Sequence, residues 1–407
     1  MSNAIVRSVL VAAVLSVGGL VVAGQAAGPR TSPALAETFT ALQSAVNAKR
    51  YAEATAKARE VLASPRKTPD DVYAANYFLV QIAGAQGNPA GQIAGMEGML
   101  ESGFSPGVAT QNQFRKALAS AYFRQKNYAQ ALKYGTALIQ SGSGDPDVYT
   151  VVGQSYYQQR NYGEAVKLFG GLVSNAEKAG RRPDRNDLTF LYSSYSKAGN
   201  QDAAQTTLET LVRHYPDPNT WLQLLYEVKK ERLDPRQKLH LYRLMESTGN
   251  LKRGPDFMDY SNAATALGLA SESYHVLEAA LKAKAFEAQI ELDRADRYIR
   301  SAKVRADEAR AALPKLETAA RAAPTGNEFV SLGMAHFSFG QYRQAIEALK
   351  AGIARGGLKN VADAQLTLGT AQLKAGQKAE AAQTFKAIKT DDEVTQRIAK
   401  LWALHAS

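Results

Sequence analysis

The pattern of apolar and polar residues in the middle of the chain repeats every 34 residues. Within each copy the apolar residues return at helical spacing, so they form a stripe on one side of each of two helices. A duplication with a period between about 20 and 50 residues predicts a stack of repeats rather than one globular core. The matching residues are Leu118, Ala119, Tyr122 and Ala131 in one copy, and Val152, Gly153, Tyr156 and Ala165 in the next.

Small side chains recur at two fixed positions of each copy, the eighth and the twentieth. Ala119 and Gly153 hold the eighth position, and Ala131 and Ala165 hold the twentieth. Two antiparallel helices approach most closely there, and only Gly, Ala or Ser leaves room for both backbones. Large residues at positions seven, eleven and twenty-four fill the space beside that contact.

This pattern resembles the tetratricopeptide repeat (TPR) family, whose unit has small residues at positions eight and twenty and aromatic residues near eleven and twenty-four. The resemblance implies an all-α fold, a right-handed superhelical solenoid of helix-turn-helix (TPR-like) repeats. Sequence signals for strands are absent. Because this fold is widespread and carries many functions, the resemblance says little about the ligand.

Further units with this spacing extend the array over residues 34–283, about six in all, and they are clearest between residues 112 and 216. The unit that contains Trp221 lacks the small residues at positions eight and twenty, so we expect its two helices to pack less tightly. The pattern returns as a C-terminal pair over residues 326–390. Residues 391–407 form one more amphipathic stretch, which we expect to cap the exposed end of the stack.

Residues 284–321 differ in character because they are rich in Ala and in charged residues. The spacing of the flanking units leaves room for one degenerate repeat here, and a solvated helical spacer is the other interpretation. Pro314 has no backbone N–H and clashes with the preceding turn, so we expect it to kink or end a helix.

The first 27 residues have the pattern of a secretory signal peptide. One charged residue, Arg7, precedes an apolar run from Val9 to Val22, and small residues follow. Gly24 and Ala26 fit the small-residue positions of a cleavage site, so we expect cleavage near Ala26 and export to a bacterial periplasm. An uncleaved anchor is the competing interpretation, although the run is shorter than the roughly 20 residues of a spanning helix.

The composition argues against catalysis and against metal or cofactor binding. The 407 residues include no Cys, which excludes disulfides, a thiol nucleophile, thiolate metal sites and lipid anchoring through Cys. The five His lack metal-site spacing, and no phosphate-binding glycine loop is present. Gly103–Gly107 fits G-x-S-x-G and Ser194–Lys197 fits S-x-x-K, but the first lies between helices and the second contains a repeat core residue. We therefore predict no enzymatic activity, no cofactor and no metal.

The chain is basic, with a formal net charge of +11 and a pI of about 9.5. Such a balance attracts anionic partners in general. Nucleic acid is a poor candidate, because an export signal is present and no basic run with interleaved aromatic residues is found. A cell-wall or other polyanion stays an alternative ligand for the basic surface. We expect membrane association only through protein partners.

The resembled family presents positions two, five, nine, twelve and thirteen of each first helix on a concave groove. Carried over to this chain, those positions contain five basic residues and three aromatic residues against one acid, Asp147. Basic side chains hold carboxylates and aromatic faces grip an extended chain. We therefore expect an acidic segment or a free C-terminal carboxylate as the ligand, and an ordinary solvated face is the alternative. The candidate groove residues are Lys116, Phe123, Arg124, Gln154, Tyr157, Gln158, Asn186, Lys197, Tyr226, Lys229 and Lys230.

These features together predict a non-enzymatic periplasmic scaffold or adaptor that binds envelope proteins or peptides through its groove. Some members of the resembled family clamp two carboxylates with Lys at position five and Asn at position nine. Lys116 matches that clamp, but Ser120 does not. The link Gly356–Asn360 and the repeat after it are similar to those of periplasmic repeat proteins of Ton-type energy-transduction systems. A basic polyanion binder and an enzyme are the alternatives.

Overall fold

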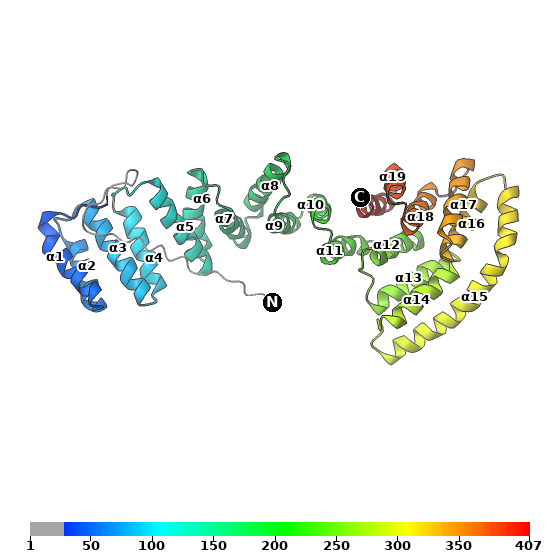
Figure 1. Ribbon diagram of the computed structural model, residues 1–407, viewed down its shortest axis with the longest axis horizontal. Coiled ribbons are helices and arrows are strands. Elements are labelled where there is room, and N and C mark those ends of the chain that lie inside the picture. Colours follow the sequence, from blue (N-terminus) through cyan, green and yellow to red (C-terminus); the bar gives the residue numbers. More distant parts are fainter. Residues whose placement is uncertain (1–27) are drawn as a thin grey trace. The chain divides into compact units, whose positions relative to one another are not determined.

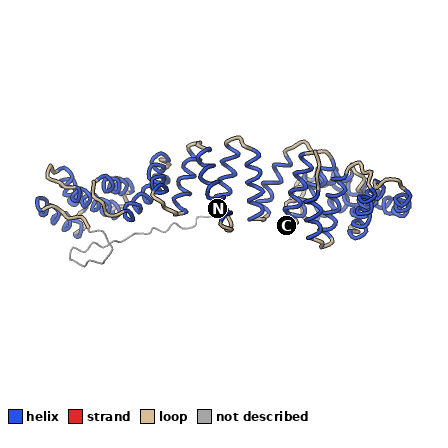
Figure 2. The backbone as a smooth tube through the Cα atoms, turned by 90° about the horizontal axis from the view of Figure 1, so that it is seen from above, coloured by secondary structure: helices blue, strands red, loops and turns tan. Residues whose placement is uncertain are grey.

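The structure is a computed structural model that describes residues 28–407, and every regular element in this range is helical. Twenty α-helices and one short 3₁₀-helix, η1 (Pro33–Leu35), follow one another here without a strand (Figures 1 and 2). The prediction of an all-α solenoid of helical repeats is confirmed. The predicted signal peptide lies outside the described residues. No helix among residues 28–407 combines the length and the apolar character that crossing a membrane requires.

The chain divides into two compact units, one ending at Glu164 and the other beginning at Ala165. The N-terminal unit contains α1 (Ala36–Asn47), α2 (Tyr51–Ala63), α3 (Pro69–Ala85), α4 (Pro89–Glu101), α5 (Val108–Arg124), α6 (Tyr128–Gln140) and α7 (Pro146–Gln158). The C-terminal unit contains most of α8 (Tyr162–Lys178), and then α9 (Arg185–Lys197), α10 (Gln201–His214), α11 (Pro218–Lys229), α12 (Pro235–Ser247), α13 (Gly254–Ala266), α14 (Ala270–Lys282), α15 (Gln289–Ala322), α16 (Asn327–Ser338), α17 (Tyr342–Arg355), α18 (Val361–Lys374), α19 (Lys378–Ala387) and α20 (Glu393–His405).

The turns inside the two clearest repeats share one backbone conformation. Lys126 and Arg160 stand at the same turn position with φ of 59° and 60°, a left-handed conformation that few non-Gly residues adopt. Asn127 follows the first of them and caps α6, because its side-chain oxygen accepts a hydrogen bond from the Gln130 backbone N–H. This cap satisfies a donor that the start of a helix leaves unpaired. The period in the sequence therefore corresponds to a period in the backbone.

The small residues lie where the two helices of a repeat are closest, as the sequence predicts. Ala119 at position eight is buried. A Cβ atom added at Gly333 would lie 2.6 Å from Leu349, and one added at Gly369 would lie 2.5 Å from Phe385. Both distances are shorter than van der Waals contact, so a larger side chain at position eight would push the paired helices apart.

The repeat that contains Trp221 pairs its helices loosely, as its missing small residues predict. Its helices α11 and α12 meet over much less of their length than the paired helices of neighbouring repeats. Instead, α12 packs against α13, α18 and α20. Eight of its thirteen residues are buried, including His240 and Arg243. α12 is therefore an interior helix of the C-terminal unit (Figure 1).

Residues Gln289–Ala322 form a single helix, α15, which packs along α14 and α16. Pro314 lies inside it, so of the two outcomes expected there, a kink or an end of the helix, the end does not occur. Pro314 is exposed, and so is Arg310, whose carbonyl loses its usual helical donor. Because water reaches that side of the helix, the missing hydrogen bond costs less than it would in the interior.

Candidate protein-interaction surfaces

Lys116 on α5, the first of the predicted groove residues, is already paired. It makes ion pairs with Asp145 and Asp147, and its Nζ lies 3.1 Å from the Asp147 carboxylate. The hydrogen bond to Asp145 raises the pKa of Lys116 above its usual value. Asp145 is the N-cap residue of α7, where unpaired backbone N–H groups favour a carboxylate. Lys116 therefore links two consecutive repeats.

Two of the predicted lysines in the C-terminal unit are also paired. Lys229 binds the buried carboxylate of Asp256 in the first turn of α13, and Lys230 lies 2.7 Å from Glu227. Three of the five basic residues counted at the groove positions, Lys116, Lys229 and Lys230, therefore have an acidic partner within the chain. Asp145, Asp147 and Asp256 lie at helix starts, and of these only Asp147 is among the positions counted from the sequence.

Two of the predicted aromatic residues contact a ring of their own repeat. Phe123 meets Tyr128 edge to face with ring centroids 5.7 Å apart, and Tyr157 meets Tyr162 in the same way at 5.4 Å. The two pairs occupy the same places in consecutive repeats, so the contact belongs to the repeat itself. Phe123 and Tyr157 are half-buried, and each leaves part of its surface open.

The remaining predicted residues are open to a partner. Arg124 and Lys197 are exposed and have no ion pair among the described residues. Tyr226 is half-buried, and its hydroxyl accepts a hydrogen bond from Arg253 at 3.0 Å. Of the amides, Gln154 is half-buried, and Gln158 and Asn186 are exposed.

The equivalent face of the C-terminal repeats is covered by α12, which sequence reasoning missed. With Gly369 at position eight of α18, the groove positions two and thirteen are Asp363 and Lys374. Asp363 accepts from His240 Nε2 at 2.8 Å and from Arg236 Nη1 at 3.2 Å. Lys374 donates to the Glu246 carboxylate at 3.1 Å. These contacts place α12 along α18 from its first turn to its last.

Helix α16 contributes to the same covered face. Its residue Phe337, at groove position twelve, lies under the guanidinium of Arg243, with the guanidinium carbon 4.2 Å from the ring centroid. The next residue, Ser338, accepts a hydrogen bond from the Glu272 backbone N–H at 3.0 Å. The only sequence signal that α12 covers this face is that α12 has no small residue at position twenty and carries leucines on more than one side.

Helix α20 closes over α12 from another side. The Trp402 indole N–H donates to the His240 carbonyl at 3.2 Å, and the Gln237 amide donates to Asp392 at 2.9 Å. Near the end of both helices, the Ser247 hydroxyl lies 2.7 Å from His405 Nε2. The last helices of the chain therefore return to the middle of the C-terminal unit.

A buried charge network joins α12 to α13 and α14. Arg243 binds Glu272 through two parallel hydrogen bonds of 2.7 Å, and the Tyr260 hydroxyl donates to the same carboxylate at 2.8 Å. Burial alone would raise the pKa of Glu272, but the charge and hydrogen bonds of Arg243 hold it below its usual value. Burial lowers the pKa of His240. Removing one member would leave the others unpaired, so the network fixes which residues face one another.

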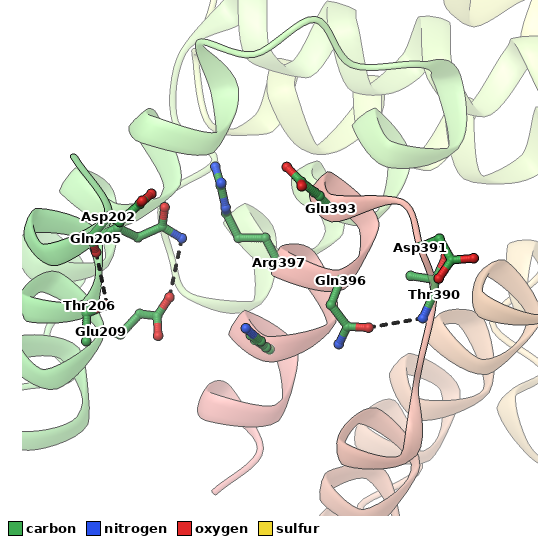
Figure 3. A pocket seen from close by; sticks show the side chains of 10 residues that line it. Asp202, Gln205, Thr206, Glu209, Thr390, Asp391, Glu393, Gln396 and Arg397 are labelled. Carbon is green, nitrogen blue, oxygen red and sulfur yellow. Dashed lines mark hydrogen bonds between the residues drawn. The ribbon is translucent and has the colours of Figure 1, made fainter. Parts of the chain in front are cut away.

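A polar pocket of about 340 Å³ lies between α10 and α20 (Figure 3). Asp202, Gln205 and Glu209 line it from α10, and Glu393 and Arg397 line it from α20. Within it, the Gln205 amide donates to Glu209 on α10, and the Gln396 side chain of α20 accepts from the Thr390 backbone N–H in the preceding loop. Among residues 28–407, no three His, Asp or Glu side chains lie together as a metal ion requires.

Comparison with known proteins gives matches to repeat models. Residues 193–218 and 330–393 each match a family model described as tetratricopeptide repeat. No curated protein sequence matches the chain.

Three solved structures illustrate the likeness, all at low identity. Naa15/Naa10 bound to HypK-THB has 16% identity and a TM-score of 0.37, covering 87% of this chain and 63% of that chain. The TPR2AB-domain:pHSP90 complex of yeast Sti1 has 13% identity and a TM-score of 0.26, covering 74% and 100%. A tetratricopeptide repeat protein from Parabacteroides merdae has 14% identity and a TM-score of 0.25, covering 72% and 98%. The chain thus spans less than two thirds of the first of these.

Proposed function

The chain is a tetratricopeptide repeat protein, and we propose that it works in the bacterial periplasm as a non-catalytic scaffold that holds an envelope protein or peptide. Stacked repeats of this kind form extended surfaces for protein partners. In this proposal the first-helix faces of α5 and α7 receive the partner. The recognised part is an acidic segment or a chain end with a free carboxylate.

A difference in burial between two first helices carries this proposal. Ten of the fourteen residues of α18 are buried, because α12 covers its face, but only two of the seventeen residues of α5 are buried. The open face of α5 ends with Arg124, whose guanidinium suits a two-point contact with a carboxylate. Phe123 beside it offers part of an apolar ring to the same ligand.

Photo-crosslinking tests which face binds the partner. A photoreactive amino acid at Gln158, on the first helix α7, is compared with one at Ala129, an exposed residue of the second helix α6. We expect Gln158 to form a covalent adduct with a distinct envelope protein, and we expect Arg124→Glu to remove that adduct. Equal adducts from both positions, or an adduct that survives Arg124→Glu, would contradict the proposal.

The proposed location and pathway have separate supports. The signal-peptide pattern of residues 1–27 supports the periplasm, and the similarity of Gly356–Asn360 to Ton-associated repeat proteins supports a Ton-type partner. We expect cell fractionation to recover the chain in the periplasm with its N-terminus near Ala26. Among the crosslinked proteins we expect a component of a Ton-type system. Recovery of the intact chain from the cytosol would overturn the location.

A second candidate is the binding of a polyanion such as a cell-wall polymer. Arg181 and Arg182 are exposed in the loop after α8, and the guanidinium carbon of Arg182 lies 3.6 Å from the ring centroid of Tyr215. Binding through such a surface weakens steeply as salt rises. A salt titration therefore distinguishes it from binding that also uses apolar contacts on α5.

A further inference from the structure

The C-terminal repeats hold α12 in the place that a repeat groove offers to a ligand. The contacts along α12 come from one stripe: Arg236, His240 and Arg243, at spacings of four and three residues. Residues at such spacings share one side of a helix. Asp363 accepts hydrogen bonds from Arg236 and His240, and the Arg243 guanidinium packs over the ring of Phe337. A groove that anchors three residues of one helical stripe is typical of helix-in-groove recognition.

Polar contacts provide much of the specificity of this interface. Asp363 is buried, with Arg236 of α12 as its charged partner and His240 of α12 as a hydrogen-bond partner, and Lys374 and Asp392 add polar contacts at the two ends of α12. Buried ion pairs contribute less net stability than apolar packing does, because both charges lose their water. They nevertheless select a partner strongly, since an unmatched helix would leave Asp363 without a cation.

We propose that the face formed by α16, α18 and α20 is a receptor for a helix, with α12 as its built-in ligand. A partner helix that presents the same stripe of Arg, His and Arg competes with α12 for this face. Release moves α18–α20 away from α12 and leaves the pairing of α12 with α13 in place. The contact of α12 with α13 is more extensive than its contacts with α18 and α20, so α12 stays with α13 in such a movement. This inference does not depend on the proposed ligand of α5 and α7.

A labelled peptide with the sequence of residues 234–248 tests the proposal by fluorescence anisotropy against the full chain. In the unmodified chain α12 competes, so the peptide binds weakly. Arg236→Ala weakens the internal ligand and retains the receptor, and the Arg236 side chain is 44% exposed, so the variant is expected to fold. We expect this variant to bind the peptide about tenfold more tightly, because apparent affinity follows the fraction of open molecules.

Two controls make the test specific. Adding Asp363→Asn to Arg236→Ala removes the negative charge of the receptor face, and we expect it to abolish the gain in peptide affinity. Lys238→Ala, on the same helix but outside the anchoring stripe, should leave peptide binding as in the unmodified chain. A peptide in which Arg236 and His240 are replaced by Ala should not bind any variant.

The outcomes that overturn the proposal are distinct from misfolding. Circular dichroism first confirms that each variant is helical, and hydrogen exchange shows whether α18–α20 have lost protection. If exchange shows an open face that binds no peptide, the face is not a receptor. Equal binding of the natural and the Ala-substituted peptide also overturns the proposal. Arg124→Glu, on α5, should leave this binding unchanged whatever its effect on the crosslinking test.

Discussion

Asp187 illustrates how the surroundings of a single side chain set its charge. It stands in the first turn of α9, three residues after Asp184, which caps the same helix. Burial, together with the nearby negative charge of Asp184, raises the pKa of Asp187 to about 6. The start of a helix favours a carboxylate and opposes this shift. The folded protein therefore binds a proton at Asp187 that the unfolded chain, with an ordinary Asp pKa, releases at lower pH.

This difference predicts a loss of stability between about pH 4 and pH 6. The folded pKa is raised, so the stabilising contribution is present below the unfolded pKa and is lost as pH rises through the folded value. Asp187→Asn cannot ionise, so its stability relative to the unmodified chain should increase as pH rises across that range, and at pH 7 the variant should be more stable by on the order of 1 kcal/mol. Urea unfolding of both proteins at pH 4, 5, 6 and 7 measures this difference in stability. Parallel pH curves for both proteins would contradict the assignment.

At the scale of the helix, an acid at the start of one repeat binds a cation from the previous repeat. Lys116 binds Asp145, and Arg185 binds Asp217 at 2.7 Å. Asp145 and Asp217 are also N-cap residues, so each carboxylate both caps the start of a helix and joins two repeats. This double role explains why Lys116, a cation predicted to face a ligand, is already paired.

The two roles of Asp145 predict different costs for two substitutions. Asp145→Asn keeps an oxygen that can cap α7 but removes the charge, so we expect a loss below about 1 kcal/mol. Asp145→Ala removes both, and we expect a loss of about 1–2 kcal/mol. Lys116→Met serves as the control, because it breaks the ion pair without touching the cap. Denaturant unfolding that ranks Asp145→Asn with Asp145→Ala would show that the cap contributes little.

The sequence predicts the helix pairs and their small contact residues, because those depend on neighbours within one repeat. It does not reveal that α12 lies against α18 and α20, because that contact joins residues more than a hundred positions apart. His240 and Asp363 carry no local signal of their pairing. The sequence also leaves open whether the helix continues through Pro314, for a similar reason. Whether Pro ends a helix depends on solvent and packing around its carbonyl partner, which a sequence pattern does not show.

At the scale of the C-terminal unit, closure by α20 turns a stack with an exposed end into a unit whose last helix meets its middle. Ile398, Leu401 and Trp402 are fully or almost fully buried. The Trp402 ring stacks on Phe385 with centroids 5.3 Å apart, and its N–H reaches α12. One side chain thus joins α19, α20 and α12. Much of the closure should therefore depend on Trp402.

We expect Trp402→Ala to destabilise the C-terminal unit by about 3–5 kcal/mol, because it leaves a cavity and frees the His240 carbonyl. Trp402→Phe keeps the stacked ring, so it should cost less. The chain has two Trp, and both Trp402 and Trp221 lie in this unit. Trp fluorescence therefore reports on the unfolding of the C-terminal unit alone. Circular dichroism follows both units. In denaturant, the fluorescence midpoint of Trp402→Ala should fall while part of the helical signal unfolds where it did before. An unchanged fluorescence midpoint would mean that the packing of α20 on α12 contributes little, and that other contacts hold the unit closed.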